Sequence, residues 1–210
     1  MKNSGVFGLL ILAIVTALFL TAGDGVNTSP SARGYHQMAY DSESGLVILY
    51  GGQTGYWLDP AFQNHKTWSF NPKSEKWKEM SPDVIPGGFA GGDMAYDSES
   101  DRIILSIISD GFSTLQTWSY DTNHDNWTRM SDGPQHMVGQ RIVYDSESDR
   151  IILFGGFEFS KYQLVDETWA YDFNTDTWTN MDPRIHPEPR NYHDLAYNPK
   201  VDRIILWGGD

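Results

Sequence analysis

Short alternating apolar segments separated by polar turns run through most of the chain. A typical segment, YDSESDRIILFGG at residues 144–156, has a turn of Asp, Ser and Glu followed by an apolar run that stops at two glycines. Short β-branched and aromatic runs bounded by Ser, Asp and Gly are typical of strands. The pattern therefore predicts a β-hairpin, and no window after the first 23 residues has a helical period.

This hairpin phrase occurs four times, at residues 40–52, 96–108, 144–156 and 197–209. A second phrase, with two tryptophans around a turn of Asn, Asp, Pro and Lys, follows each of the first three copies, at 67–80, 117–130 and 168–181. Such turns also favour hairpins. Two hairpins make a four-stranded antiparallel sheet, and sheets repeated about every 50 residues and stacked radially form a β-propeller. The predicted fold class is therefore all-β.

The unit resembles the kelch repeat, in which two glycines end the second strand and a tryptophan stands in the fourth. The resemblance covers residues 33–209, and it includes the Arg and His that often open a kelch blade: Arg33, His36, Arg190 and His193. It implies a kelch-type propeller with four-stranded antiparallel blades at 33–80, 87–130 and 137–181 and a half blade at 189–210. Blade two departs from the pattern because Ile107 and Ile108 replace the two glycines, so its bend after Leu105 is expected to be made differently or not at all.

The predicted ring is incomplete. The resemblance to kelch propellers implies a closed ring of six or seven blades, whereas this chain supplies about three and a half. Open blade faces and strand edges favour association. Two explanations stay open: the sequence is part of a longer propeller, or several chains assemble into one ring by self-association through the open blade edges.

The first residues do not belong to the predicted core. Lys2 precedes an uncharged apolar run at residues 6–20, which is followed by small residues, as in a secretory signal peptide. We expect residues 1–23 to be a cleaved signal and 24–32 a short linker, which predicts a secreted or extracytoplasmic protein. The alternative is an N-terminal membrane anchor at residues 5–22, which just reaches spanning length.

Charge and cysteine content exclude several classes of protein. The chain has 28 acidic and 15 basic side chains, a formal net charge of −13, and no cysteine. Such a charge repels nucleic acid and anionic lipid, so neither is expected as a partner. Without cysteine there is no disulfide, thiolate nucleophile or cysteine metal site. Galactose oxidase, a copper enzyme similar in its propeller domain, needs a tyrosine crosslinked to a cysteine, and we expect no cofactor here.

Variable connections on one face of a rigid scaffold are where binding is usually found. In this repeat they are the connections after the second and fourth strands, notably residues 53–66 and 157–167. The candidate ligand-binding residues are aromatic side chains with nearby carboxylates: Tyr56, Trp57, Asp59, Phe62, Glu158, Phe159 and Tyr162. Flat rings beside acids suit a sugar or a cationic ligand. The alternative is that these rings cover the hydrophobic rim between blades.

No catalytic or metal-binding residue is predicted. The repeated acids belong to hairpin turns, and the calcium-like spacing of Asp121, Asn123 and Asp125 lacks the glycine and glutamate of a calcium loop. His36 and His193 share one repeat position, where we expect them to satisfy backbone groups around the channel.

The predicted function is therefore an exported module that binds protein or carbohydrate. The alternative is a carbohydrate-active enzyme of the oxidase or sialic-acid isomerase type, with its active site incomplete or in missing blades. A convergent His or acid cluster on the variable-loop face favours the enzyme, and aromatic rings with unperturbed acids favour binding.

Overall fold

The computed structural model describes residues 29–55, 63–88, 91–109, 114–134 and 137–210, and these residues contain strands and turns but no helix. Three four-stranded antiparallel sheets and a separate hairpin make up most of the structure. Blade one contains β1 (Gln37–Asp41), β2 (Leu46–Tyr50), β3 (Thr67–Asn71) and β4 (Lys76–Glu79). Blade two contains β5 (Asp93–Asp97), β6 (Arg102–Ile108), β7 (Leu115–Asp121) and β8 (Asn126–Arg129). Blade three contains β10 (Arg141–Asp145), β11 (Arg150–Phe154), β14 (Thr168–Asp172) and β15 (Thr177–Asn180), and the hairpin contains β16 (His193–Asn198) and β17 (Arg203–Gly208).

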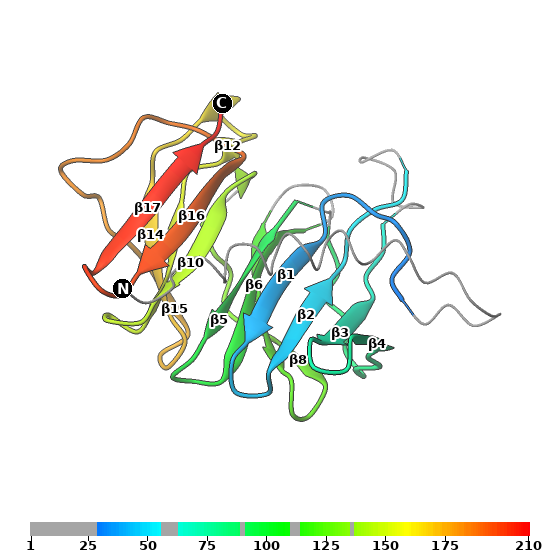
Figure 1. Ribbon diagram of the computed structural model, residues 1–210. Coiled ribbons are helices and arrows are strands. Elements are labelled where there is room, and N and C mark those ends of the chain that lie inside the picture. The colour runs from blue at the N-terminus through cyan, green and yellow to red at the C-terminus, as the bar shows by residue number, and fades with distance from the viewer. Residues whose placement is uncertain (1–28, 56–62, 89–90, 110–113, 135–136) are drawn as a thin grey trace.

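The first strand of each unit lies innermost. Strand β1 contacts β5, β5 contacts β10, and β10 contacts β16, so four inner strands lie side by side along an arc (Figure 1). The described strands do not close a ring. The all-β, propeller-like fold with four-stranded antiparallel blades confirms the prediction from the repeated hairpins. Of the described residues, none form a helix long and apolar enough to span a bilayer.

The acids of the repeated phrase form turns, as predicted. The side chain of Asp97 accepts the backbone N–H groups of Glu99 and Ser100 at 3.0 and 3.1 Å. Asp41 and Asp145 do the same in blades one and three. A side-chain oxygen that takes two backbone donors closes the turn without help from the rest of the fold, which is why this hairpin could be read from sequence.

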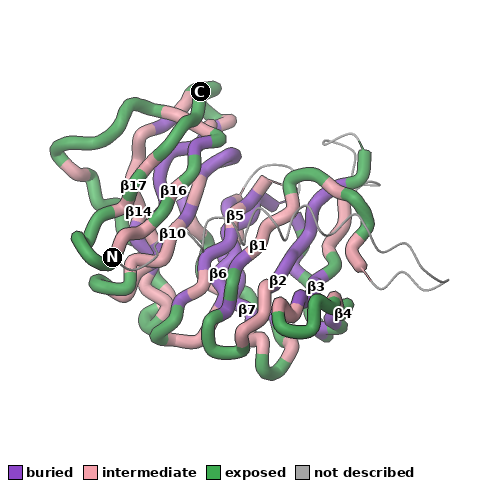
Figure 2. The backbone as a smooth tube through the Cα atoms, viewed as in Figure 1, coloured by how far each residue is buried: buried purple, intermediate pink, exposed green. Residues whose placement is uncertain are grey.

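The hydrophobic core lies between the blades rather than within one (Figure 2). The joint between blades one and two buries Ile48 of β2 against Ile103 and Leu105 of β6, each 0% exposed. The joint between blades two and three buries Ile104 of β6 against Ile151 of β11. Alternate residues of β6 therefore serve opposite joints, as the period-two pattern requires.

The second tryptophan of an outer hairpin ties its blade to the preceding one. The indole Nε1 of Trp127 donates to the Thr67 hydroxyl at 2.9 Å, and that of Trp178 donates to Thr117 at 2.9 Å. Each bond joins the fourth strand of one blade to the third strand of the blade before it. The recurrence of threonine and tryptophan in the second phrase therefore has a structural cause.

The two glycines end the second strand because the chain approaches a neighbouring backbone closely there. Gly155 has φ of 66°, and a Cβ on it would lie 2.5 Å from the carbonyl oxygen of Arg190. Blade two lacks the glycines and also lacks the bend. Its strand β6 continues by pairing Ile107 with Gln116 and Ile108 with Leu115.

A small three-stranded sheet lies on the variable-loop side of blade three. It consists of β9 (Met137–Val138), β12 (Phe157–Glu158) and β13 (Gln163–Leu164), with β12 in the centre. This sheet was not predicted, because strands of two residues are too short to show a periodicity.

Candidate functional site

The variable loops contain only part of the predicted ligand-binding set within the described residues. Tyr56, Trp57, Asp59 and Phe62 lie outside the residues that the structure describes. The other three, Glu158, Phe159 and Tyr162, lie on the connection between β11 and β14.

These three side chains have different environments. Glu158 is 7% exposed and accepts from the Ser160 hydroxyl at 2.5 Å and from Lys161 Nζ at 2.9 Å. Phe159 packs against the buried pair Ile108 and Val138. Tyr162 is 83% exposed. The set therefore includes a buried acid, a ring that covers a small apolar cluster and a ring that is open to solvent.

A second set of residues lies where the inner strands begin, on the same side as the variable loops. At one repeat position just before each inner strand, the backbone is left-handed in all four units, with φ of 54° at Tyr35, 108° at Gly91, 72° at Gly139 and 52° at Tyr192. Glycine adopts this conformation without strain, whereas for a residue with a Cβ it costs about 1–2 kcal/mol of conformational free energy. Tyr35 and Tyr192 therefore have strained backbones, although their rings are 53% and 48% exposed and gain little from burial. Strained backbone that carries an exposed aromatic ring is typical of a functional site.

The two tyrosines lie in one electrostatic environment although they belong to opposite ends of the arc. Burial raises the pKa of Tyr192, the phenol of Tyr35 adds to this increase, and the charge of Arg141 opposes it. We call the region where the four inner strands begin, with Tyr35, Arg141 and Tyr192, the axial mouth.

One repeat position, the first or second residue of each inner strand, adds one amide and three charged side chains at the axial mouth: Gln37, Asp93, Arg141 and Asp194. Asp93 is mostly buried, and its two oxygens accept the backbone N–H groups of Met94 at 3.0 Å and Ile142 at 2.8 Å. Burial raises the pKa of Asp93 to about 6, against the effect of these two bonds and of Arg141. Asp93 therefore fastens β5 to β10, while Asp194 is exposed.

His193 lies beneath the axial mouth. It is 1% exposed, its ring meets the edge of Phe154 with centroids 5.5 Å apart, and neither ring nitrogen has a well-aligned hydrogen-bond partner among the described residues. Burial, together with the charges of Arg141 and Arg190, lowers the pKa of His193 to about 4. Nδ1 of His36 also lacks such a partner. Even so, against the lowering by burial, the backbone of Arg33 raises the pKa of His36 and the backbone of Phe154 raises the pKa of His193, so each ring interacts with a backbone group, although not with ideal geometry.

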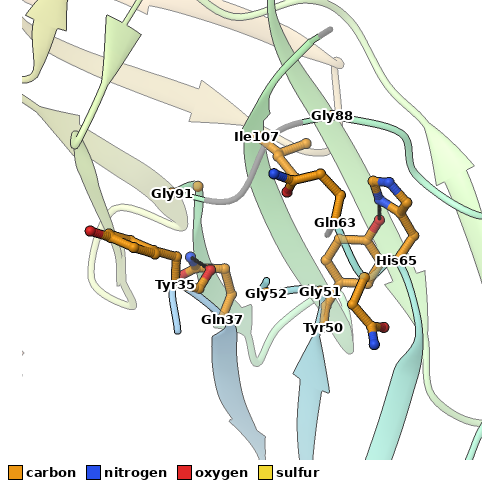
Figure 3. Close-up of a pocket in the computed structure, with 12 residues that line it drawn as sticks. Tyr35, Gln37, Tyr50, Gly51, Gly52, Gln63, His65, Gly88, Gly91 and Ile107 are labelled. Carbon is orange, nitrogen blue, oxygen red and sulfur yellow. Dashed lines mark hydrogen bonds between the residues drawn. The ribbon is translucent and has the colours of Figure 1, made fainter. Parts of the chain in front are cut away.

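A pocket with an empty volume of about 230 Å³ adjoins the axial mouth between blades one and two. Figure 3 shows Tyr35 and Gln37 on one side of Gly51 and Gly52, with Gln63 and His65 on the other. Gly52 has φ of 94°, and a Cβ on it would lie 2.9 Å from the Gly34 carbonyl. The backbone at Gly52 therefore packs closely against the backbone at Gly34 and forms one wall of the pocket. Side-chain amide and imidazole groups surround this wall, and together they suit a small polar group such as a hydroxyl.

Sequence reasoning missed the axial mouth. The sequence does contain a signal for it, because one repeat position is Tyr, Gly, Gly and Tyr in the four units. Two glycines at a repeat position indicate a left-handed backbone. Tyrosine at the same position is unfavourable for folding, so it points to a role in function.

The left-handed backbone gives a direct test. Tyr35→Gly is expected to raise the free energy of unfolding by about 1 kcal/mol, because it removes the strain of φ 54° and loses a ring that is 53% exposed. Urea unfolding of the wild type and the variant measures this difference. A loss of stability of more than 1 kcal/mol would show that the Tyr35 ring is instead part of the core.

The fold and the site together define a propeller-like scaffold, which supports a binding or interaction module at a coarse level. Comparison with known proteins bears on the fold alone. No family model matches the chain. Mei4-dependent protein 6 of Schizosaccharomyces pombe is 24% identical over 203 residues, which cover 85% of this chain and 28% of the relative.

Among solved structures, the one described as "Structure of YjhT", a β-propeller, superposes with a TM-score of 0.65 at 16% identity. The match covers 84% of this chain and 59% of that one. This chain therefore spans less than two thirds of the length of either protein, and the likeness shows the fold.

Proposed function

We propose that the protein is an exported kelch-type propeller module that binds a carbohydrate at the axial mouth. The observation that carries the proposal is the pair of exposed tyrosines held on left-handed backbone, Tyr35 and Tyr192. Aromatic faces cover the C–H surface of a sugar, while Arg141 and Asp194 offer a donor and an acceptor for its hydroxyl groups. Export rests on the apolar segment at residues 6–20, which lies outside the described residues.

The test is binding of a defined set of neutral oligosaccharides, namely maltotetraose, cellotetraose and lactose, measured by calorimetry on the full chain. At least one is expected to bind, and the double variant Tyr35→Gly with Tyr192→Gly is expected to lose at least tenfold in affinity because two ring faces disappear. The matched control is Tyr40→Ser, which removes a ring that is 55% exposed on β1 but lies outside the axial mouth. Equal losses in the double variant and the control, or no binding by the wild type, would contradict the proposal.

A carbohydrate-active enzyme is the second candidate, favoured by one observation. Asp93, with its pKa raised to about 6, and His193, with its pKa lowered to about 4, are perturbed groups near one mouth, as catalytic groups often are. Against it, both oxygens of Asp93 are engaged by backbone N–H groups. Turnover of any of the three oligosaccharides that Asp93→Asn abolishes would favour the enzyme over the binding module.

A further inference from the structure

A groove runs along the outer half of the joint between blades two and three. It lies between the segment that leaves blade two, residues 131–134, and the outer strands of blade three, and its empty volume is about 1110 Å³. Two indole rings line it, Trp169 of β14 and Trp178 of β15. Because Tyr171 pairs with Trp178 across the two strands, Trp169 and Trp178 are diagonal neighbours on one face of the sheet.

The equivalent joint between blades one and two has no such opening at its tryptophans. Trp118 is 8% exposed and Trp127 is 1% exposed, whereas Trp169 and Trp178 are both partly exposed. Both joints keep the same indole-to-threonine hydrogen bond at 2.9 Å. The difference therefore lies in what covers the rings and not in how the blades are joined.

One substitution within the repeat contributes to the opening. The ring of Tyr50 packs edge-on against Trp127 with centroids 5.2 Å apart, but the same position of blade two is Ser106, which brings no ring to Trp178. The small side chain at this position leaves open part of an aromatic surface that the other joint buries.

The walls of the groove are predominantly acidic. Its lining has four carboxylates and one lysine: Asp132, Glu158, Glu167, Asp176 and Lys161. Lys161 pairs with Glu158 at 2.9 Å, and Arg129, beside the lining, pairs with Asp132. With both cations included, the formal charge of the groove is −2. Glu167 lies directly beside the aromatic surface, because its Oε2 accepts from Trp169 Nε1 at 2.8 Å.

We propose that this groove binds a lysine- or arginine-rich segment of a partner protein. A cation above an indole face and near a carboxylate gains from both the ring quadrupole and the charge, and tryptophan is the best ring for this purpose. The protein's net charge of −13 also attracts cationic partners over longer distances and speeds their association. The groove is separate from the axial mouth, so this proposal does not depend on whether a carbohydrate binds at the axial mouth.

The chain itself supplies a conservative variant for the test. Glu167 corresponds to Gln116 of blade two, whose Oε1 already accepts from Trp118 Nε1 at 2.9 Å. Glu167→Gln therefore removes the charge and keeps the hydrogen bond to the indole. The probe is a labelled hexalysine peptide, followed by fluorescence anisotropy with the full chain. We expect Glu167→Gln to weaken binding at least threefold and Trp169→Leu to weaken it about tenfold.

Two controls separate this groove from binding by overall charge. Asp83→Asn removes one exposed carboxylate from the segment that leaves blade one, outside the groove, and is expected to change the affinity less than twofold. Hexalysine acetylated on its side chains keeps the chain length without the charge and is expected not to bind. Equal weakening by Asp83→Asn and Glu167→Gln, binding of the acetylated peptide, or no binding of hexalysine by the wild type would each overturn the proposal.

Discussion

Replacing Trp127 with alanine is expected to lower the free energy of unfolding by about 3–5 kcal/mol, as for other large buried aromatic residues. Trp127 is 1% exposed and lies against Tyr50 and Tyr120 with ring centroids 5.2 and 4.7 Å apart. Its indole also donates to Thr67, so its loss leaves a buried hydroxyl without this partner. Urea unfolding followed by circular dichroism measures the difference, with an unchanged m-value showing that the same surface unfolds.

Trp77 is the matched control because it holds the same repeat position in blade one. It contacts Phe70 of its own blade at 5.0 Å, and its Nε1 has no hydrogen-bond partner among the described residues. Trp77→Ala is expected to cost less than about 2 kcal/mol, since no bond between blades is lost. Equal losses for the two variants would mean that these tryptophans act within their blades, and that the joints contribute little to stability.

The blades could be predicted from sequence because their signals are local. The turn around Asp97 is closed by its own side chain, and the nearly continuous apolar run of Arg102–Ile108 indicates a strand that is buried on both faces. Both act within a few residues, so a single copy already carries the information and four copies make it clear. Only the consequence of replacing the glycines in blade two was left open, and there the strand continues.

The axial mouth and the groove between blades two and three could not be predicted in the same way. The mouth exists because four inner strands, which are far apart in the sequence, lie side by side along an arc, and no local pattern encodes this arrangement. The groove depends on a missing ring, since Ser106 is too small to cover Trp178 as Tyr50 covers Trp127. A missing side chain has meaning only once the equivalent joint, covered by Tyr50, is available for comparison.

Opposing titrations at the axial mouth are expected to cancel in the wild type and to separate in single variants. The folded pKa of Asp93, about 6, lies above its unfolded value, so this group lowers stability increasingly as the pH rises from about 4 to about 6. The folded pKa of His193, about 4, lies below its unfolded value, so this group lowers stability as the pH falls from about 6.5 to about 4. The two slopes have opposite signs over nearly the same range, so these two groups offset each other in the wild type, where His36, whose pKa burial also lowers, still reduces stability as the pH falls.

Asp93→Asn leaves only the histidine slope, and the variant is expected to lose about 2 kcal/mol between pH 7 and pH 4.5. His193→Gln leaves only the aspartate slope and is expected to gain about 2 kcal/mol over the same interval. Urea unfolding at half-unit steps of pH measures both relative to the wild type, and the double variant, with neither group, should run nearly parallel to the wild type. Because each variant moves stability in the direction opposite to the other, a general loss of packing cannot imitate the pair of results. Parallel curves for the wild type and both single variants would show that Asp93 and His193 do not change protonation on folding, and that burial at the axial mouth leaves both groups hydrated.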